Sequence, residues 1–468
     1  MSYKVPFELK NPDLLKYDSY VHGEWVKAKS GKTFEVVDPG SDKAWAACPD
    51  NGAEDVDNAI QSSYKAFKEY GVMNPRKRAE LILAWHNLIT ENKDDLAKIL
   101  TYETGKPLAE AAGELTYSLG FTWWFAGEAE RIQGAISTPS APNRRTFIVK
   151  QPIGPAVALV PWNFPVAMVM RKAGAAFAAG CTMTVKPSPE TPLTCLSLAY
   201  LASKAGFPPG VFNVLTTSLE NTPPLSEAMI LHPLVKKVTF TGSTRIGKLV
   251  AGLCARNLKK CTLELGGNCP FIIFDDANLE QALEQFMALK WRHAGQACIT
   301  ANRLYVQAGV YDKFTQMVVE RTSKLKLGHG GEESTTIGPV CTPRGLVKAE
   351  EQAEDAVKHG AKMVLGTGKA EKGAKEADGS GKGQGVGGYF MSPTILTNMS
   401  SDMLMAREET FAPVCGLFKF ETEQEVVKWA NDTSMGLGKS CLSPMDHLLI
   451  SYQRRTLLRR TSTECGEC

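Results

Sequence analysis

Residues 240–247 read FTGSTRIG, and this stretch does most to indicate the fold. It follows a short apolar run, Val238 to Phe240, that is typical of a buried strand, and it leads into a helical stretch. The small residues Gly242 and Ser243 would let backbone N–H groups approach a pyrophosphate at the N-terminus of that helix. The alternative is an ordinary strand-to-helix turn in which Ser243 only caps the helix. The stretch by itself leaves both interpretations open.

Strands and helices alternate on either side of this turn. Before it, we expect apolar strands at 157–160, 181–185 and 212–215 and helices at 166–179 and 194–205. After it, we expect strands at 271–274 and 304–306 and helices at 279–288 and 313–324. Strands that alternate with helices predict parallel α/β sheets, here in two domains. Helical patterns at 54–98 and 108–127 precede the first set, and residues 131–150 are expected to form an extended arm or hairpin.

Size and composition describe an ordinary globular protein. The chain has 468 residues, too many for one hydrophobic core, with 43% hydrophobic and 22% charged residues. The 53 Lys and Arg residues nearly balance the 50 Asp and Glu residues, which argues against nucleic acid or a membrane surface as a partner. The sequence shows no membrane span and no targeting signal, so we expect a cytoplasmic protein. The pair Cys465 and Cys468 offers too few ligands for a metal site, and no metal is expected.

Three segments carry residues that could perform covalent chemistry. They are WRHAGQAC at 291–298, which ends in Cys298, LELGG at 263–267, which contains Glu264, and PWNFP at 161–165, which contains Asn163. A thiol, a carboxylate and an amide can supply a nucleophile, a base and an oxyanion donor. Considered alone, Cys298 would be a buried small residue, but the three segments together favour catalysis. His293 is expected to be a core or surface histidine, because a Cys-His hydrolase needs a third orienting group that we do not find.

Lys186 ends one of the expected strands, in the segment VKPSPETP at 185–192. A lysine at the carboxyl end of a strand lies where open α/β sheets bind ligands, and it could contact ribose hydroxyls. The alternative is a solvated lysine before a turn, which the segment alone favours.

Six motifs together resemble a known family. PWNFP, VKPSPETP, FTGSTRIG, LELGG, GQAC and EETF at 408–411 occur in the order found in the aldehyde dehydrogenase superfamily. The resemblance runs from about Phe34 to Leu437, and the sequences around Arg171 and Arg292 are most similar to those of the succinate-semialdehyde dehydrogenase branch. It implies an α/β fold with a Rossmann-type cofactor domain, an α/β catalytic domain and a β-arm for oligomerisation. The implied boundaries are 1–130 and 151–261 for the cofactor domain, 131–150 for the arm and 262–437 for the catalytic domain.

The resemblance also implies a role for each motif residue. Cys298 would be the nucleophile, Glu264 the base that activates water, and Asn163 an oxyanion donor together with the backbone N–H of Cys298. The residues implied to bind NAD or NADP are Trp162, Lys186, Ser188, Gly242, Ser243, Glu409 and Phe411. Arg171 and Arg292 would clamp a substrate carboxylate, for which the planar guanidinium is well suited. The alternative for both arginines is a structural ion pair.

The sequence departs from the family pattern at three places. Thr300 stands where the semialdehyde enzymes often have a second cysteine, so no redox disulfide can form across that pair. Pro189, followed by Glu190, stands where NAD-preferring relatives usually have Glu, which leaves NADP allowed. Residues 438–468 form a divergent tail in place of the family's glycine-rich segment and subunit-pairing strand.

The expected activity is the oxidation of succinate semialdehyde to succinate with NAD(P)+, in the breakdown of 4-aminobutyrate. One alternative is the same chemistry on another aldehyde, such as glutarate semialdehyde or an aminoaldehyde. A second alternative is an inactive product that lost catalysis with the altered tail. The expected partners are a small aldehyde and a second copy of the chain, as a homodimer or homotetramer that the tail puts in question, with no nucleic acid and no membrane.

Overall fold

The computed structural model describes residues 3–371 and 387–442. The chain forms two compact units. Unit 1 consists of Met1–Asp38, Asp42–Thr104 and Leu108–Leu265. Unit 2 consists of Pro39–Ser41, Gly105–Pro107 and Gly266–Cys468. The expected tail and the cysteine pair Cys465 and Cys468 fall mostly or wholly outside the described residues.

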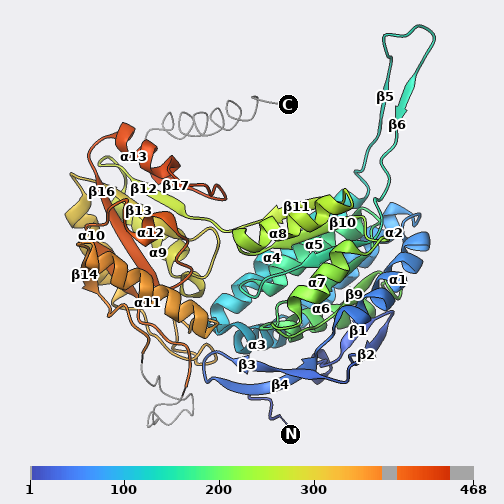
Figure 1. Cartoon of the computed structure of the whole chain (residues 1–468), viewed down its shortest axis with the longest axis horizontal. Helices are drawn as coiled ribbons and strands as arrows, with labels where there is room; N and C mark the ends of the chain where they lie inside the picture. The colour runs from blue at the N-terminus through green and yellow to red at the C-terminus, as the bar shows by residue number, and fades with distance from the viewer. Residues whose placement is uncertain (1–2, 372–386, 443–468) are drawn as a thin grey trace. The chain divides into compact units, whose positions relative to one another are not determined.

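Unit 1 is built on a seven-stranded sheet with the order β11-β10-β7-β8-β9-β1-β2 (Figure 1). The parallel strands are β7 (Ala156–Leu159), β8 (Met183–Lys186), β9 (Phe212–Val214), β10 (Lys237–Thr241) and β11 (Lys260–Glu264). The antiparallel strands β1 (Ser19–Val21) and β2 (Glu24–Val26) extend one edge. β7 and β8 are buried along their whole length, as expected for parallel strands covered on both faces.

Eight helices and a small antiparallel ribbon complete the described part of unit 1. The helices are α1 (Ala53–Tyr70), α2 (Pro75–Glu91), α3 (Lys93–Thr104), α4 (Leu108–Ala129), α5 (Pro165–Ala178), α6 (Pro192–Lys204), α7 (Thr222–Leu231) and α8 (Thr244–Arg256). The ribbon pairs β3 (Thr33–Asp38) with β4 (Lys43–Pro49). α2, α5 and α6 begin with proline, whose fixed φ and missing N–H suit the first turn of a helix.

Two buried glutamates fix the helices that follow β7 and β8. Glu114 accepts hydrogen bonds from the backbone N–H groups of Val166 and Ala167 in the first turn of α5, at 2.9 and 3.2 Å. Glu103 accepts hydrogen bonds from the backbone N–H groups of Leu193 and Thr194 in the first turn of α6. A carboxylate at a helix N-terminus satisfies N–H groups that have no partner within the helix. These caps set the start of α5, and therefore the position of the PWNFP turn before it.

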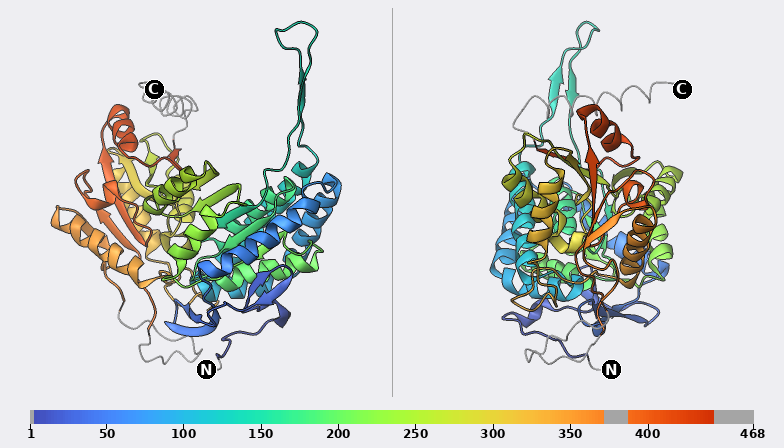
Figure 2. Two further views of the ribbon diagram at one scale, coloured as in Figure 1. Left: turned by 45° about the vertical axis from the view of Figure 1, so that its right-hand side comes forward. Right: turned by 90° about the vertical axis from the view of Figure 1, so that its left-hand side faces the viewer.

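Residues 131–150 contain a hairpin. β5 (Ala135–Ser137) pairs antiparallel with β6 (Thr146–Ile148). Both views of Figure 2 show this ribbon projecting from the rest of unit 1. Ile136 and Phe147 are each 70% exposed, and Val149 is 76% exposed.

Unit 2 contains a six-stranded sheet with the order β14-β15-β16-β13-β12-β17. Its strands are β12 (Cys269–Ile273), β13 (Ala301–Gln307), β14 (Lys362–Leu365), β15 (Thr394–Thr397), β16 (Val414–Phe420) and β17 (Ser440–Leu442). Only β14 is antiparallel to its neighbour. The helices are α9 (Leu279–Lys290), α10 (Tyr311–Thr322), α11 (Pro343–Lys358), α12 (Leu404–Arg407) and α13 (Glu423–Asn431).

The predicted parallel α/β sheets are confirmed, with two differences at the boundaries. Glu264 was expected in the domain that begins at residue 262, but it ends β11 in the sheet of unit 1, because β11 pairs in register with β10. Ser440 to Leu442 were assigned to the divergent tail, but they form β17, which pairs with β12 through Phe271 to Ile273. None of the helices in the described residues is both long and apolar enough for a membrane span.

Candidate active site

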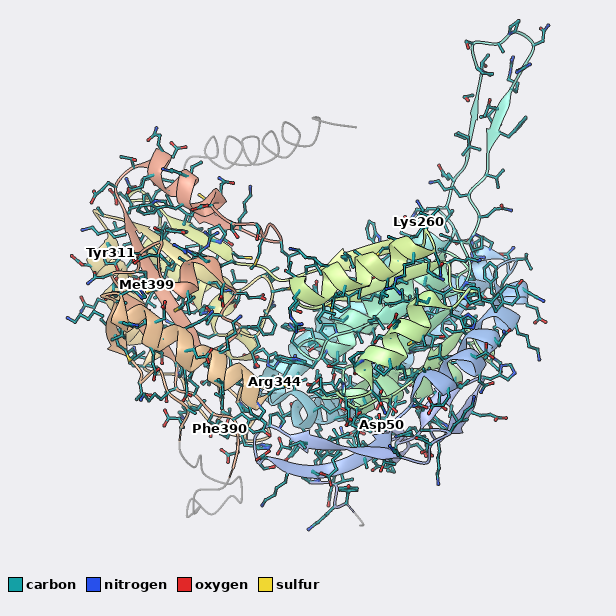
Figure 3. All side chains as sticks on the ribbon, viewed as in Figure 1. Asp50, Lys260, Tyr311, Arg344, Phe390 and Met399 are labelled. Carbon is teal, nitrogen blue, oxygen red and sulfur yellow. The ribbon has the colours of Figure 1, made fainter. Side chains whose placement is uncertain are left out.

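Glu264 is held by three side chains of unit 1. Its Oε2 accepts a hydrogen bond from the hydroxyl of Thr241 at 2.7 Å, and the ammonium of Lys172 lies 3.5 Å from the same oxygen. Nη1 of Arg171 donates to Oε1 at 3.1 Å and to Oε2 at 3.3 Å. Thr241 faces Glu264 because the two residues are register partners at the ends of β10 and β11, while the lysine and arginine come from α5. Figure 3 labels Lys260, the first residue of β11.

These contacts keep Glu264 ionised. Its burial raises the pKa, but Lys172, the Thr241 hydroxyl and Arg171 together outweigh burial and hold the pKa below its ordinary value. Burial lowers the pKa of Lys172 to about 8, against the opposing effect of Glu264. The carboxylate is therefore charged. It can also be reached from solvent, because 32% of the Glu264 side chain is exposed. Those are the properties that a base acting on water needs.

The guanidinium of Arg171 has two further contacts, both on α4. Nη2 donates to the hydroxyl of Tyr117 at 3.0 Å, and the guanidinium carbon lies 5.0 Å from the centre of the Phe121 ring. A cavity of about 420 Å³ in unit 1 adjoins this cluster. Its lining includes Arg171, Lys172 and Glu264 together with Ile153 and Met183.

The strand order of unit 1 reverses beside β7. The chain runs outward from β7 to β8 and β9, and then returns to place β10 and β11 on the other side of β7. The carboxyl ends of β7 and β10 are therefore neighbours at which the strand order reverses, where open α/β sheets bind ligands. β7 leads to Trp162 and Asn163 before α5, and β10 leads to Gly242 and Ser243 before α8. Two helix N-termini thus begin at this edge. That of α5 is already capped by Glu114, whereas that of α8 suits a pyrophosphate.

The predicted cofactor residues of unit 1 fit this arrangement. Lys186 ends β8 and is buried, and burial lowers its pKa to about 8 while Glu190 opposes that shift. The hydroxyl of Ser188 donates to Glu190. Ser243 is the N-cap of α8, and its side chain accepts from Ile246 at 3.5 Å. Ser243 therefore caps α8, as the alternative interpretation of this stretch expects.

In unit 2, an unusual backbone precedes Cys298. His293, Ala294 and Gly295 all have positive φ values, of 52°, 52° and 75°. This conformation costs a residue with a side chain about 1–3 kcal/mol, and such strain is concentrated at functional sites. His293 is buried, and burial, Lys106 and Arg292 hold its pKa well below the ordinary value, so it is a neutral core histidine, as expected.

Gly267, the last residue of LELGG, meets the EETF motif beside Cys298 within unit 2. The N–H of Gly267 donates to Oε1 of Glu409 at 3.2 Å. A side chain at Gly267 would place its Cβ 2.3 Å from the carbonyl oxygen of Cys298, so the glycine is required by close packing. Burial raises the pKa of Glu409 to about 7, against the opposing effects of Gly267 and Lys348. Phe411 also lies in this motif, with a positive φ of 56°.

The remaining residues near Cys298 show what the sequence did and did not indicate. Arg292 is exposed, and Thr300 is buried and donates to the carbonyl of Leu289. Sequence reasoning missed Cys269, whose thiol donates to the Cys298 carbonyl at 3.5 Å and whose pKa is raised to about 11 by burial.

Sequence reasoning also missed the neighbours of Glu264. Lys172 and Tyr117 lie outside the six motifs, and Thr241 lies in FTGSTRIG without a predicted role, so only tertiary contact reveals all three. The structure brings Arg171 against Glu264 in unit 1 and Glu409 against Gly267 in unit 2. Asn163 and Glu264 belong to unit 1, whereas Cys298 and Arg292 belong to unit 2.

Comparison with known proteins gives a family for most of the chain. The sequence model of the aldehyde dehydrogenase family matches residues 25–455, and so continues past Leu437. The chain is 45% identical over 429 residues to the NADP(+) succinate-semialdehyde dehydrogenase of Saccharomyces cerevisiae, covering 92% of this chain and 83% of that one. It is 44% identical over 431 residues to 3-sulfolactaldehyde dehydrogenase of Pseudomonas putida, covering 92% and 85%.

A solved structure shows the same fold. The crystal structure of an Escherichia coli NADP-dependent enzyme superposes with a TM-score of 0.90 at 41% identity, covering 96% of this chain and 89% of that one. The family match, the sequence identities and the superposition agree over most of the chain. The chain therefore belongs to the aldehyde dehydrogenase family and is an NAD(P)-dependent enzyme of aldehyde oxidation.

Proposed function

We propose that the chain oxidises succinate semialdehyde to succinate with NAD(P)+, in the breakdown of 4-aminobutyrate. The observation that carries this proposal is the guanidinium of Arg171, which lies 3.1 Å from Glu264 and is itself partly exposed. A planar cation beside the base suits an aldehyde with a second, anionic end. It disfavours an aminoaldehyde, whose ammonium group Arg171 would repel.

The motif residues would divide the reaction into two halves. The thiolate of Cys298 adds to the aldehyde carbon, and Asn163 and the backbone N–H of Cys298 stabilise the resulting oxyanion. The residues named above would hold NAD(P)+, which would supply the hydride acceptor, and loss of the hydride from the adduct would leave a thioester on Cys298. Glu264 then takes a proton from water, whose oxygen attacks the thioester carbon. The carbon–sulfur bond breaks, and Cys298 leaves as the thiolate.

The choice between NAD and NADP depends on Glu190. An acidic side chain near the adenosine ribose would repel a 2′-phosphate, as in the Rossmann fold in general. Here Glu190 accepts a hydrogen bond from Ser188 and lies near Lys186. We propose that both cofactors bind.

The hairpin at 131–150 is proposed to pair with a second copy of the chain. An isolated two-stranded ribbon is marginally stable in water, and this one exposes Ile136, Phe147 and Val149. Contact with another subunit would bury them. Size-exclusion chromatography should show a dimer or tetramer, and a variant with Ile136→Ser and Phe147→Ser should shift towards monomer.

The substrate proposal is tested with five aldehydes: succinate semialdehyde, glutarate semialdehyde, 3-sulfolactaldehyde, 4-aminobutanal and butanal. We expect the highest kcat/KM for succinate semialdehyde and the lowest for 4-aminobutanal. A sulfonate is also an anion that Arg171 can bind, and the chain is 44% identical to a 3-sulfolactaldehyde dehydrogenase, so that aldehyde is the second candidate. Equal kcat/KM values for all five would contradict the proposal.

A further inference from the structure

Arg171 contacts the proposed general base directly. Its Nη1 donates to both oxygens of Glu264, at 3.1 and 3.3 Å. Arg171 is also the residue proposed to bind the carboxylate of the substrate. One guanidinium is therefore available to two carboxylates, one from the protein and one from the substrate.

The geometry of the existing pair leaves it open to exchange. Glu264 uses only Nη1, whereas the tightest arginine–carboxylate pairs use two nitrogens in parallel. Nε of Arg171 has no hydrogen-bond partner among the described residues, although it is buried. The pair is also partly exposed, with 25% of the Arg171 side chain and 32% of the Glu264 side chain accessible. Solvent weakens such pairs.

Glu264 would keep a defined position if Arg171 changed partner. The hydroxyl of Thr241 and the ammonium of Lys172 both hold Oε2, and Lys172 is almost completely buried and donates to Thr241 at 2.7 Å. Arg171 is likewise supported from its other side, by the Tyr117 hydroxyl and the Phe121 ring. Neither support depends on the ion pair between Arg171 and Glu264.

We propose that Arg171 restrains Glu264 until the anionic end of an acidic aldehyde takes the place of Glu264 on the guanidinium. The inference rests on the proposed function, since it requires a substrate with a second anionic group. Once Arg171 no longer contacts it, Glu264 is a stronger base, because Arg171 is one of the three groups that lower its proton affinity. Hydrolysis of the thioester would then be fast for acidic aldehydes and slow for neutral ones.

In this arrangement Tyr117 and Phe121 are positioning residues. They hold the guanidinium at α4 through one hydrogen bond and one ring contact. Without the Tyr117 hydroxyl, the Arg171 side chain would be less restricted in position, and it would bind the substrate carboxylate less tightly. The expected signature is a higher KM for acidic aldehydes and an unchanged KM for neutral ones.

The test compares succinate semialdehyde with butanal on the full chain and on Arg171→Met. Rapid mixing measures the first burst of reduced cofactor, which reports thioester formation, and the later steady rate, which reports its hydrolysis. We expect Arg171→Met to raise the KM for succinate semialdehyde by about tenfold or more, because charge-assisted contacts are lost. We expect the same variant to speed hydrolysis of the butanal thioester several-fold, and the apparent pKa of that step to rise.

Two further variants make the result decisive. Arg171→Lys keeps a cation beside Glu264, so its butanal thioester should be hydrolysed as slowly as in the unaltered chain. Tyr117→Phe should raise only the KM for succinate semialdehyde. Circular dichroism confirms that each variant is folded.

The inference is overturned if Arg171→Met leaves butanal thioester hydrolysis unchanged or slows it. It is also overturned if Arg171→Lys speeds hydrolysis of the butanal thioester as much as Arg171→Met does. A kcat/KM for succinate semialdehyde no higher than that for butanal in the unaltered chain would contradict the proposed function alone. The butanal measurements would then still decide whether Arg171 restrains Glu264.

Discussion

Glu264 in unit 1 and Glu409 in unit 2 are carboxylates in opposite electrostatic surroundings. Lys172, Thr241 and Arg171 lower the pKa of Glu264 despite its burial. Glu409 receives one backbone hydrogen bond, from Gly267, and burial raises its pKa to about 7. The same functional group is therefore kept ionised in one unit and is half protonated near neutral pH in the other.

The difference indicates separate tasks. A base that acts on water must be ionised before the reaction and accessible to water. A carboxylate that accepts hydrogen bonds from ribose hydroxyls needs a fixed position, which the close contact with Gly267 provides. The two residues are of one type and both lie in family motifs, so their neighbours, not their identity, separate the roles.

The largest expected effect comes from the nucleophile that both carboxylates are proposed to serve. Cys298→Ala should lower aldehyde oxidation by about four orders of magnitude or more, because no thioester can form. Steady-state assays of cofactor reduction measure this. Thr300→Ala is the matched control, and it should stay within a few-fold of the unaltered chain. Substantial turnover by Cys298→Ala would remove the basis for comparing the two carboxylates.

Arg292→Ala should have the next largest effect. Loss of a charge-assisted contact costs about 1.5–3 kcal/mol, so the KM for succinate semialdehyde should rise at least about tenfold. Butanal, which has no carboxylate, serves as the control substrate. If both KM values rise equally, Arg292 has a structural role, and the recognition of the anion is left to Arg171.

Lys172→Met would make the surroundings of Glu264 more like those of Glu409. The variant removes a cation 3.5 Å from the carboxylate, so the pKa of Glu264 should rise. Since the ionised form is the base, the acid limb of the kcat profile should move to higher pH. An acid limb that stays in place would show that Glu264 does not titrate in that step.

Glu409→Gln should have the smallest effect. With a pKa of about 7, Glu409 is mostly ionised above that pH and mostly protonated below it. If the ionised form binds the ribose, the KM for the cofactor should fall as the pH rises through 7, and the Gln variant should lose this dependence with a few-fold higher KM. A large loss of kcat at saturating cofactor would contradict the assignment.

Much of the architecture could be predicted from the sequence. Alternating apolar runs and helical patterns placed β7, β9, β10, β12 and β13 closely, because buried parallel strands have short continuous apolar segments. β11 was missed, although KCTLE at 260–264 alternates polar and apolar residues as a half-buried edge strand does. β17 was missed because the sequence after Leu437 was read as unrelated to the family.

Only the site residues that lie in recognisable motifs could be predicted from the sequence. Cys298, Glu264 and Glu409 stand in recognisable segments, and the resemblance supplied their roles. Arg171 could be identified by the same means, but its contact with Glu264 could not, since the two residues are 93 positions apart in the sequence. The left-handed backbone at Ala294 also has no sequence signal, because alanine rarely adopts it.

The most direct test of the account measures the first turnover of Glu264→Gln beside Glu409→Gln, with succinate semialdehyde and saturating NADP+. Glu264→Gln should give a burst of about one reduced cofactor per active site, followed by very slow turnover, and mass spectrometry should find a succinyl group on Cys298. Glu409→Gln should turn over without such a stall. Steady turnover by Glu264→Gln at the rate of the unaltered chain, with no acyl group on Cys298, would contradict the account.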